Sequence, residues 1–202
     1  MASPVGTLAV VGTGLIGASA ALAARRAGVE RVLGFDADPD VLAVAAAREA
    51  VTPAESLGAA VERAELVVVA APVAALPDVV REVLEHASAG CLVTDVGSTK
   101  GAVCAAAGGD GRFVGGHPIC GAETRGPERA TAELFDGATW FLTPGAATAP
   151  DGYRRVHGFV AALGARPVAI DPVAHDRLVA VTSHLPHALA NLLLNQAGSA
   201  RF

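Results

Sequence analysis

The chain has 202 residues, of which 52% are hydrophobic and 17% charged, and its formal net charge is −5. This length suits one packed domain with a small addition, and the apolar fraction excludes a disordered chain. The negative charge gives no reason to expect nucleic acid or an anionic membrane as a partner, because both need a basic surface. No apolar run approaches the roughly 20 residues of a membrane-spanning helix.

The cysteines and the N-terminus bear on the cellular compartment. Cys91, Cys104 and Cys120 are odd in number and lack metal-ligand spacing, which argues against a disulfide framework. The first residues contain no basic segment that leads into an apolar one, so we expect no signal peptide. These observations together predict a cytoplasmic protein.

Apolar runs that end at Gly or Asp alternate with Ala-rich helical segments along most of the chain. This alternation is typical of βαβ units, and it predicts a doubly wound α/β domain of the Rossmann type with a mainly parallel sheet over residues 1–171. We expect strands at Thr7–Val11, Arg31–Phe35, Leu66–Ala70, Cys91–Asp95, Arg112–Gly115, Thr139–Thr143 and Arg166–Ala169. We expect helices at Leu15–Ala27, Pro39–Ala50, Ser56–Arg63, Ala75–His86, Thr99–Ala107, Gly152–Leu163 and Val173–Ala197.

The last of these helices differs from the others because it follows a finished sheet and is strongly apolar. Pro186 lies inside it and should kink it, since an internal proline removes one hydrogen bond and crowds the preceding turn. A helix of this kind needs a partner that buries its apolar face. We therefore interpret residues 172–202 as the first helix of an all-α C-terminal domain that is cut short.

A glycine-rich loop follows the first predicted strand and opens the first predicted helix. In this G-x-G-x-x-G motif, Gly12 permits a tight turn, Gly14 leaves room for a pyrophosphate, and Gly17 lets the helix approach the strand. Leu15 and Ile16 stand in the first helical turn, whose N–H groups and partial positive charge favour phosphates. The alternative is a purely structural turn, but the strand, the helix and the acid at the right distance favour dinucleotide binding.

That acid is Asp36, which closes the second predicted strand and should accept hydrogen bonds from the adenosine ribose. A ribose phosphate beside it would be repelled, and Asp38 and Asp40 add to the negative charge. At an effective dielectric near 20, unit charges about 4 Å apart repel by roughly 4 kcal/mol. The next basic residue is Arg48, so the sequence favours NAD over NADP.

Three polar segments stand out after the glycine-rich loop and Asp36, at Asp95–Lys100, Gly115–Glu123 and Ser183–His187. The first two follow predicted strands, and ligands of open α/β sheets bind at the carboxyl ends of strands. We therefore expect these two segments to face the nicotinamide.

The motifs G-L-I-G-x-S, D-V-G-S-T-K, G-G-H-P-I-x-G-x-E and S-H-L-P-H, in this order and spacing, resemble those of prephenate dehydrogenases. The resemblance covers essentially the whole chain. It implies an NAD-dependent oxidative decarboxylation of prephenate to 4-hydroxyphenylpyruvate in tyrosine biosynthesis, by an enzyme whose full-length form is a homodimer. Arogenate and 4-amino-4-deoxyprephenate are alternative substrates because they share the cyclohexadiene and its ring carboxylate.

The resemblance assigns His117 and Ser98 as catalytic residues. A neutral imidazole suits the substrate hydroxyl, which loses its proton as hydride leaves the same carbon. Ser98 would hydrogen-bond near His117 and the nicotinamide, and Gly115, Gly116 and Gly121 would let the backbone approach the cofactor. As alternatives, His117 caps a loop, or Ser98 serves as a helix N-cap, alone or in addition to its catalytic role.

The resemblance also assigns Glu123, His184 and His187 to substrate binding. His184 and His187 could instead suggest a zinc pair, but no carboxylate or cysteine completes such a site in their segment, so we expect no metal. A satisfied helix histidine is the alternative for His184. We interpret Lys100 as a solvated or cofactor-adjacent charge.

The sequence departs from the family's pattern at its end. The family supplies a substrate-carboxylate arginine and a dimer interface from helices beyond the last one here, and Arg201 comes too early to be that arginine. Two other functions therefore stay open. One is a dinucleotide-binding module that is inactive through truncation. The other is a β-hydroxyacid dehydrogenase, which the G-G-H-P loop disfavours because such enzymes use a catalytic lysine.

Overall fold

The computed structural model describes residues 5–120 and 125–199. In this part of the chain, the strands form one eight-stranded sheet in the order β3-β2-β1-β4-β5-β6-β7-β8. The strands are β1 Thr7–Val11, β2 Arg31–Phe35, β3 Thr52–Pro53, β4 Leu66–Val69, β5 Leu92–Asp95, β6 Phe113–Pro118, β7 Thr139–Pro144 and β8 Arg166–Ala169. The α-helices are α1 Leu15–Arg26, α2 Pro39–Ala47, α3 Leu57–Val61, α4 Leu76–His86, α5 Gly101–Ala106, α6 Pro150–Ala162, α7 Pro172–Val179 and α8 Leu185–Ser199.

The sheet is mainly parallel and of the Rossmann type, as the sequence predicts. All neighbouring strands from β3 to β6 pair in parallel. β7 runs antiparallel to β6, and β8 pairs in parallel with β7. The carboxyl ends of β1, β2, β4, β5 and β6 therefore share one edge, and the strand order reverses between β1 and β4, where ligands of such sheets bind.

Two apolar cores cover the two faces of the sheet. Along β1, Leu8 and Val10 point into one core and Ala9 and Val11 into the other, as the two-residue period of a strand requires. The alanines of α1 belong to the first core and are fully buried, which lets this helix lie close to the sheet. These cores hold the strand ends, and hence the residues that follow them, in fixed positions.

All seven predicted strands are present, and β1, β2 and β8 have the predicted bounds. The sequence prediction missed β3, a two-residue edge strand that contains Pro53. Proline cannot donate to a strand ladder, so it is confined to edges and gives a poor strand signal.

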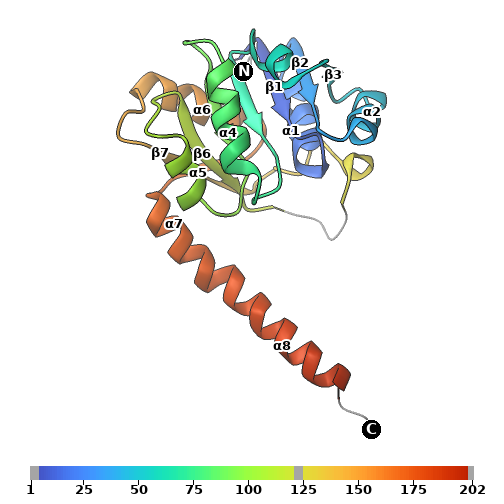
Figure 1. Cartoon of the computed structure of the whole chain (residues 1–202), viewed down its shortest axis with the longest axis vertical. Helices are drawn as coiled ribbons and strands as arrows, with labels where there is room; N and C mark the ends of the chain where they lie inside the picture. The colour runs from blue at the N-terminus through green and yellow to red at the C-terminus, as the bar shows by residue number, and fades with distance from the viewer. Residues whose placement is uncertain (1–4, 121–124, 200–202) are drawn as a thin grey trace.

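The C-terminal segment projects away from the sheet as one continuous helical rod (Figure 1). It consists of α7, a π-helical turn at Ala180–His184, and α8. We predicted a kink at Pro186, whereas the chain instead widens into the π turn just before this proline. A π turn shifts the hydrogen-bond ladder, so the missing donor of Pro186 falls in the first turn of α8 and the rod continues.

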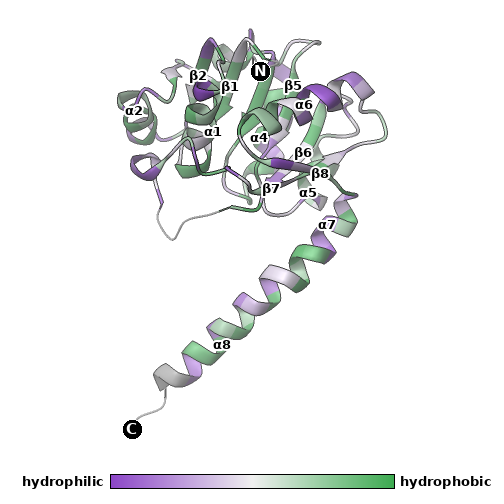
Figure 2. Ribbon diagram, turned by 180° about the vertical axis from the view of Figure 1, so that it is seen from behind, coloured by the Kyte–Doolittle hydropathy of each residue, from purple (hydrophilic) through white to green (hydrophobic). Residues whose placement is uncertain are grey.

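The green segments along α8 mark its apolar residues (Figure 2), and several of their side chains are exposed to solvent. Leu185, Leu189, Leu192, Leu193 and Leu194 are between 52% and 69% exposed. The predicted helical segment after the sheet is confirmed. The domain boundary between residues 171 and 172 stays a prediction.

Candidate active site

The glycine-rich loop connects β1 to α1 at the carboxyl edge of the sheet. Gly12 has a φ of +93°, and a Cβ atom there would lie 2.6 Å from the carbonyl oxygen of Ala70. A Cβ atom at Gly17 would lie 1.9 Å from the carbonyl oxygen of Gly12. At Gly14, by contrast, a Cβ atom would meet no atom within 4 Å. Gly12 and Gly17 allow the turn to close, and Gly14 leaves the loop surface open.

Asp36 follows β2 and holds the glycine loop from the side. Its Oδ2 atom accepts hydrogen bonds from the backbone nitrogen of Thr13 at 2.6 Å and from the Thr13 hydroxyl at 3.2 Å. Its Oδ1 atom accepts from the backbone nitrogen of Asp38 at 3.0 Å. A carboxylate has about four lone-pair sites, so Asp36 keeps acceptor capacity for a ligand.

Two cavities open at this edge of the sheet. The first, about 1190 Å³, is lined by the glycine loop, Asp36 and the exposed Arg125. The second, about 620 Å³, lies between β7 and the start of the projecting rod, and Phe141 and His184 contribute to its wall. Four residues line both cavities and mark their junction, namely Ser98, His117, Pro118 and Cys120.

His117 lies near the end of β6 at this junction. Burial lowers its pKa from 6.5 to about 4, and the electrostatic influence of His175, Lys100 and His184 acts in the same direction, against the opposing influence of the Asp176 carboxylate. His117 is therefore neutral near pH 7 and able to accept a proton.

Lys100 is fully buried and lines neither cavity, so our interpretation of it as a solvated charge is wrong. Its ammonium group forms an ion pair with the equally buried Asp95 and donates to the carbonyl oxygen of Gly116 at 2.7 Å. Asp95 also accepts from the backbone nitrogens of Gly97 at 2.8 Å and Gly116 at 2.9 Å. This pair joins the loop after β5, which carries Ser98, to the strand that carries His117.

The glycines before His117 allow close packing within the protein. A Cβ atom at Gly115 would lie 2.3 Å from the Thr143 hydroxyl, and one at Gly116 would lie 2.3 Å from the carbonyl oxygen of Asp95. Both glycines are buried. The expected approach of their backbone to the cofactor stays a prediction, and Gly121 lies outside the described residues.

Ser98 is not the N-cap of α5. The N-cap residue is Lys100, and the first amide groups of this helix are bound by a carboxylate from another helix. Asp176 of α7 accepts from the backbone nitrogens of Lys100 at 2.7 Å and Gly101 at 2.9 Å. This arrangement leaves the side chain of Ser98 at the wall of both cavities.

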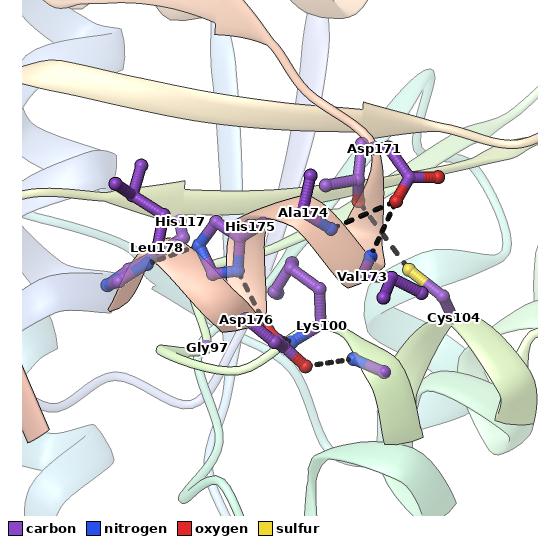
Figure 3. Close-up of polar contacts among 12 residues, drawn as sticks. Gly97, Lys100, Cys104, His117, Asp171, Val173, Ala174, His175, Asp176 and Leu178 are labelled. Carbon is purple, nitrogen blue, oxygen red and sulfur yellow. Dashed lines mark hydrogen bonds and ion pairs between the residues drawn. The ribbon is translucent and has the colours of Figure 1, made fainter. Parts of the chain in front are cut away.

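The sequence prediction missed His175, a fully buried histidine on α7 behind His117 (Figure 3). The Nε2 atom of His175 lies 2.9 Å from Nδ1 of His117, and its own Nδ1 atom lies 2.8 Å from Oδ1 of Asp176. The sequence does contain a signal for it. His175 and Asp176 are adjacent polar residues near the start of the helix that follows the last strand, where a purely apolar packing face would not need them.

The three residues assigned to substrate binding have different surroundings. His184 lies in the π turn and lines the second cavity. His187 is exposed, and its Nδ1 atom lies 2.7 Å from the carbonyl oxygen of Ser183. Neither described cavity includes it, and Glu123 lies outside the described residues. Their roles stay predictions.

Cys120 lines both cavities, and burial raises the pKa of its thiol to about 11, which keeps it protonated. Within residues 5–120 and 125–199, no group of three or more His, Cys, Asp or Glu residues is arranged to hold a metal ion. The polar chemistry of this edge therefore centres on His117 and its neighbours.

Comparison with known proteins decides the family. The family described as prephenate dehydrogenase, nucleotide-binding domain, matches residues 20–169. The chain belongs to the prephenate dehydrogenase family. It is 35% identical over 190 residues to a probable prephenate dehydrogenase, NovF, of Streptomyces niveus, covering 93% of this chain and 51% of the relative. It is also 35% identical over 201 residues to prephenate dehydrogenase of Bacillus subtilis, covering 94% and 53%.

Solved structures of the family have the same fold. Prephenate dehydrogenase from Aquifex aeolicus in complex with hydroxyphenyl propionate and NAD⁺ superposes with a TM-score of 0.88 at 29% identity, covering 94% of this chain and 68% of that one. Arogenate dehydrogenase from Synechocystis gives a TM-score of 0.86 at 30% identity, covering 96% and 70%.

The chain spans about half of the length of the two curated prephenate dehydrogenases. Among its described helices, none combines the length and the apolar character needed to cross a membrane. The structure therefore contains the family's nucleotide-binding domain together with one projecting helical rod.

Proposed function

We propose that this chain provides the NAD-binding part of a prephenate dehydrogenase, formed by residues 1–171, and the start of its helical substrate domain, formed by residues 172–202. The proposed reaction is the oxidative decarboxylation of prephenate to 4-hydroxyphenylpyruvate in tyrosine biosynthesis. The observation that carries this proposal is the junction at Ser98 and His117, where a cavity beside the glycine loop meets a second cavity.

The cofactor assignment rests on the fit of the first cavity. The open side of Gly14 leaves room for a pyrophosphate at the N-terminus of α1, and Asp36 lines the same cavity with free acceptor capacity. Arg48 is engaged elsewhere, because its guanidinium donates to the carbonyl oxygens of Glu128 and Ala130. We infer that NAD binds here, as in the related Aquifex enzyme. The residues that would hold it are Gly12, Gly14, Leu15, Ile16, Gly17, Asp36 and Ser98.

The chemistry divides among few residues. When bound, NAD supplies the acceptor for the hydride of the cyclohexadienol. His117 takes the proton of the substrate hydroxyl, which is why a neutral imidazole is needed at this point. Ser98 orients the reacting groups at the junction, and His184 contacts the substrate in the second cavity. His187 and Glu123 complete the proposed substrate contacts.

A second candidate substrate is arogenate. The structural similarity to the Synechocystis arogenate dehydrogenase is nearly the same as that to the Aquifex prephenate dehydrogenase. The cyclohexadiene is common to both substrates, and 4-amino-4-deoxyprephenate shares it too. His117 and Ser98 would act on the ring carbinol of prephenate or arogenate in the same way.

We further propose that the full-length enzyme is a cytoplasmic homodimer. The exposed leucines of α8 support this proposal, because a contiguous apolar surface of this kind is typical of contacts with another helical region or subunit.

The test is NADH formation by the protein with prephenate, arogenate and the amino analogue, measured side by side. We expect turnover with one of them, and a loss of about 100-fold or more in kcat in His117→Asn, since general-base catalysis contributes that much. The exposed histidine His157 on α6 lines neither cavity, so His157→Asn is the matched control. NAD binding should persist in both variants.

Two results would contradict the proposal. Full turnover in His117→Asn would exclude His117 as the base. NAD binding without turnover on any of the three substrates would instead support an inactive dinucleotide-binding module.

A further inference from the structure

A second buried histidine stands directly behind the proposed base. His175 on α7 is fully buried, and its ring meets that of His117 edge to face with ring centroids 5.1 Å apart. The ring of Phe141 packs against it in the same manner at 5.5 Å. Figure 3 shows His175 between His117 and Asp176, so the three side chains form a row.

Asp176 ends this row as a carboxylate. Its Oδ1 atom lies 2.8 Å from His175 Nδ1, and its oxygens also accept from the backbone nitrogens of Lys100 and Gly101. Burial by itself raises the pKa of Asp176, but these hydrogen bonds outweigh it and lower the pKa below its ordinary value. An ionised carboxylate can only accept, so the ring nitrogen that faces it has to be an N–H donor.

This requirement fixes the protons along the row. When the Nδ1 atom of neutral His175 carries its proton, its Nε2 atom is an acceptor. The 2.9 Å contact then requires that His117 donates from Nδ1. The Nε2 atom of His117 is consequently unprotonated, and His117 lines both cavities. A base needs this tautomer.

We propose that His175 and Asp176 are positioning residues that hold His117 in the base tautomer and take over its charge when it accepts a proton. This inference rests on the proposed function for the identity of the hydroxyl. In the step, the substrate O–H bond breaks, its electron pair forms the C=O bond, and an N–H bond forms at His117 Nε2. The proton on His117 Nδ1 passes to His175 Nε2, while the electron pair of the substrate C–H bond leaves as hydride to NAD.

The charges around the row favour this transfer. His117 faces Lys100 on the α5 side and His184 in the π turn, and both disfavour a positive charge on its ring. Asp95 is already paired with Lys100. His175 has the Asp176 carboxylate in direct contact, so the cation that results is stabilised there by an ion pair. The relay therefore explains how a base with a low pKa can still receive a proton.

The test uses Asp176→Ala and His175→Gln in the full protein. Alanine removes the carboxylate that faces His175 Nδ1, so the requirement that keeps the proton of His117 on Nδ1 is lost. We expect nitrogen NMR of labelled histidine to show the His117 proton on Nδ1 in the parent protein and exchanging between both ring nitrogens in Asp176→Ala. We expect kcat with prephenate to fall about 100-fold or more in both variants, with NAD affinity unchanged. The matched control is Asp171→Ala, because Asp171 caps the same helix through Val173 and Ala174 but lies outside the row.

The two readouts separate the possible failures. A kcat within about threefold of the parent protein in both variants, or an unchanged His117 tautomer in Asp176→Ala, would overturn the relay, since a purely structural role moves no tautomer. A parent protein that turns over no cyclohexadienyl substrate would contradict the proposed function. The NMR result would then still decide the tautomer.

Discussion

Leucines of β7 and leucines of α8 occupy opposite surroundings in the same chain. Leu142 in β7 is fully buried between β6, β8 and the first core, whereas Leu192 in α8 is 62% exposed. The sheet region therefore gains stability from its own apolar contacts, and the projecting rod keeps a helical form while most of its apolar surface meets solvent. Apolar periodicity predicts which side chains share a face, but it does not say whether this chain covers that face.

The largest loss of stability that we predict follows from removal of the buried Lys100 charge in the sheet region. Lys100→Met removes the partner of buried Asp95 and one donor to Gly116, so we expect a loss of about 3–5 kcal/mol in the free energy of unfolding. Arg81→Met is the matched control, because Arg81 and Asp78 form an exposed pair worth under about 1 kcal/mol. Urea unfolding measures both, and equal losses would contradict the assignment of Lys100 to the core.

The direct comparison of the two regions uses the same substitution twice. Leu142→Ala should cost about 3 kcal/mol through lost burial and a cavity. Leu192→Ala should change the free energy of unfolding by less than about 0.5 kcal/mol. Similar losses in the two variants would show that α8 is covered in solution, and the contrast as drawn would fail.

The third prediction concerns the pH dependence of stability that His117 causes, where the sheet meets the projecting rod. The pKa of His117 is about 4 in the folded protein against 6.5 in the unfolded chain, so the unfolded state binds more protons between these values. Stability is therefore retained above pH 6.5 and lost as the pH falls towards 4, by about 2 kcal/mol after allowance for solvent screening. Urea unfolding at several pH values between 4 and 6.5 measures the free energy of unfolding as a function of pH. This free energy should depend less steeply on pH in His117→Gln than in the parent protein, with exposed His157→Gln as the control. An equally steep dependence in His117→Gln would contradict the lowered pKa of His117.

Much of the sheet region was predictable because local patterns and global packing agree there. The glycine loop, the apolar strands and Asp36 each have a strong local signal, and the parallel topology brings their ends to one edge. The edge strand β3 escaped prediction because two residues and a proline carry no such signal.

The candidate site was predictable only in part, because its side chains are joined across the sequence. Lys100 meets Gly116, and His117 meets His175, 58 positions later. A lysine in a polar loop looks solvated when read locally, and its burial follows from a carboxylate at the end of the preceding strand. His175 was missed because the helical pattern assigns its segment to packing, and the local His-Asp pair does not indicate that His175 contacts His117.

The π turn at Ala180–His184 affects the orientation of the helix that follows it. Its wider winding holds one residue more than an α-helical turn, and the Thr182 hydroxyl bonds the carbonyl oxygen of Leu178 at 2.9 Å within it. Deletion of one residue here would restore the α-helical ladder and rotate everything beyond it by about 100°. The leucines of α8 would then face another direction while the sheet stayed unchanged. The one extra residue of the π turn therefore determines the direction in which the side chains of α8 face.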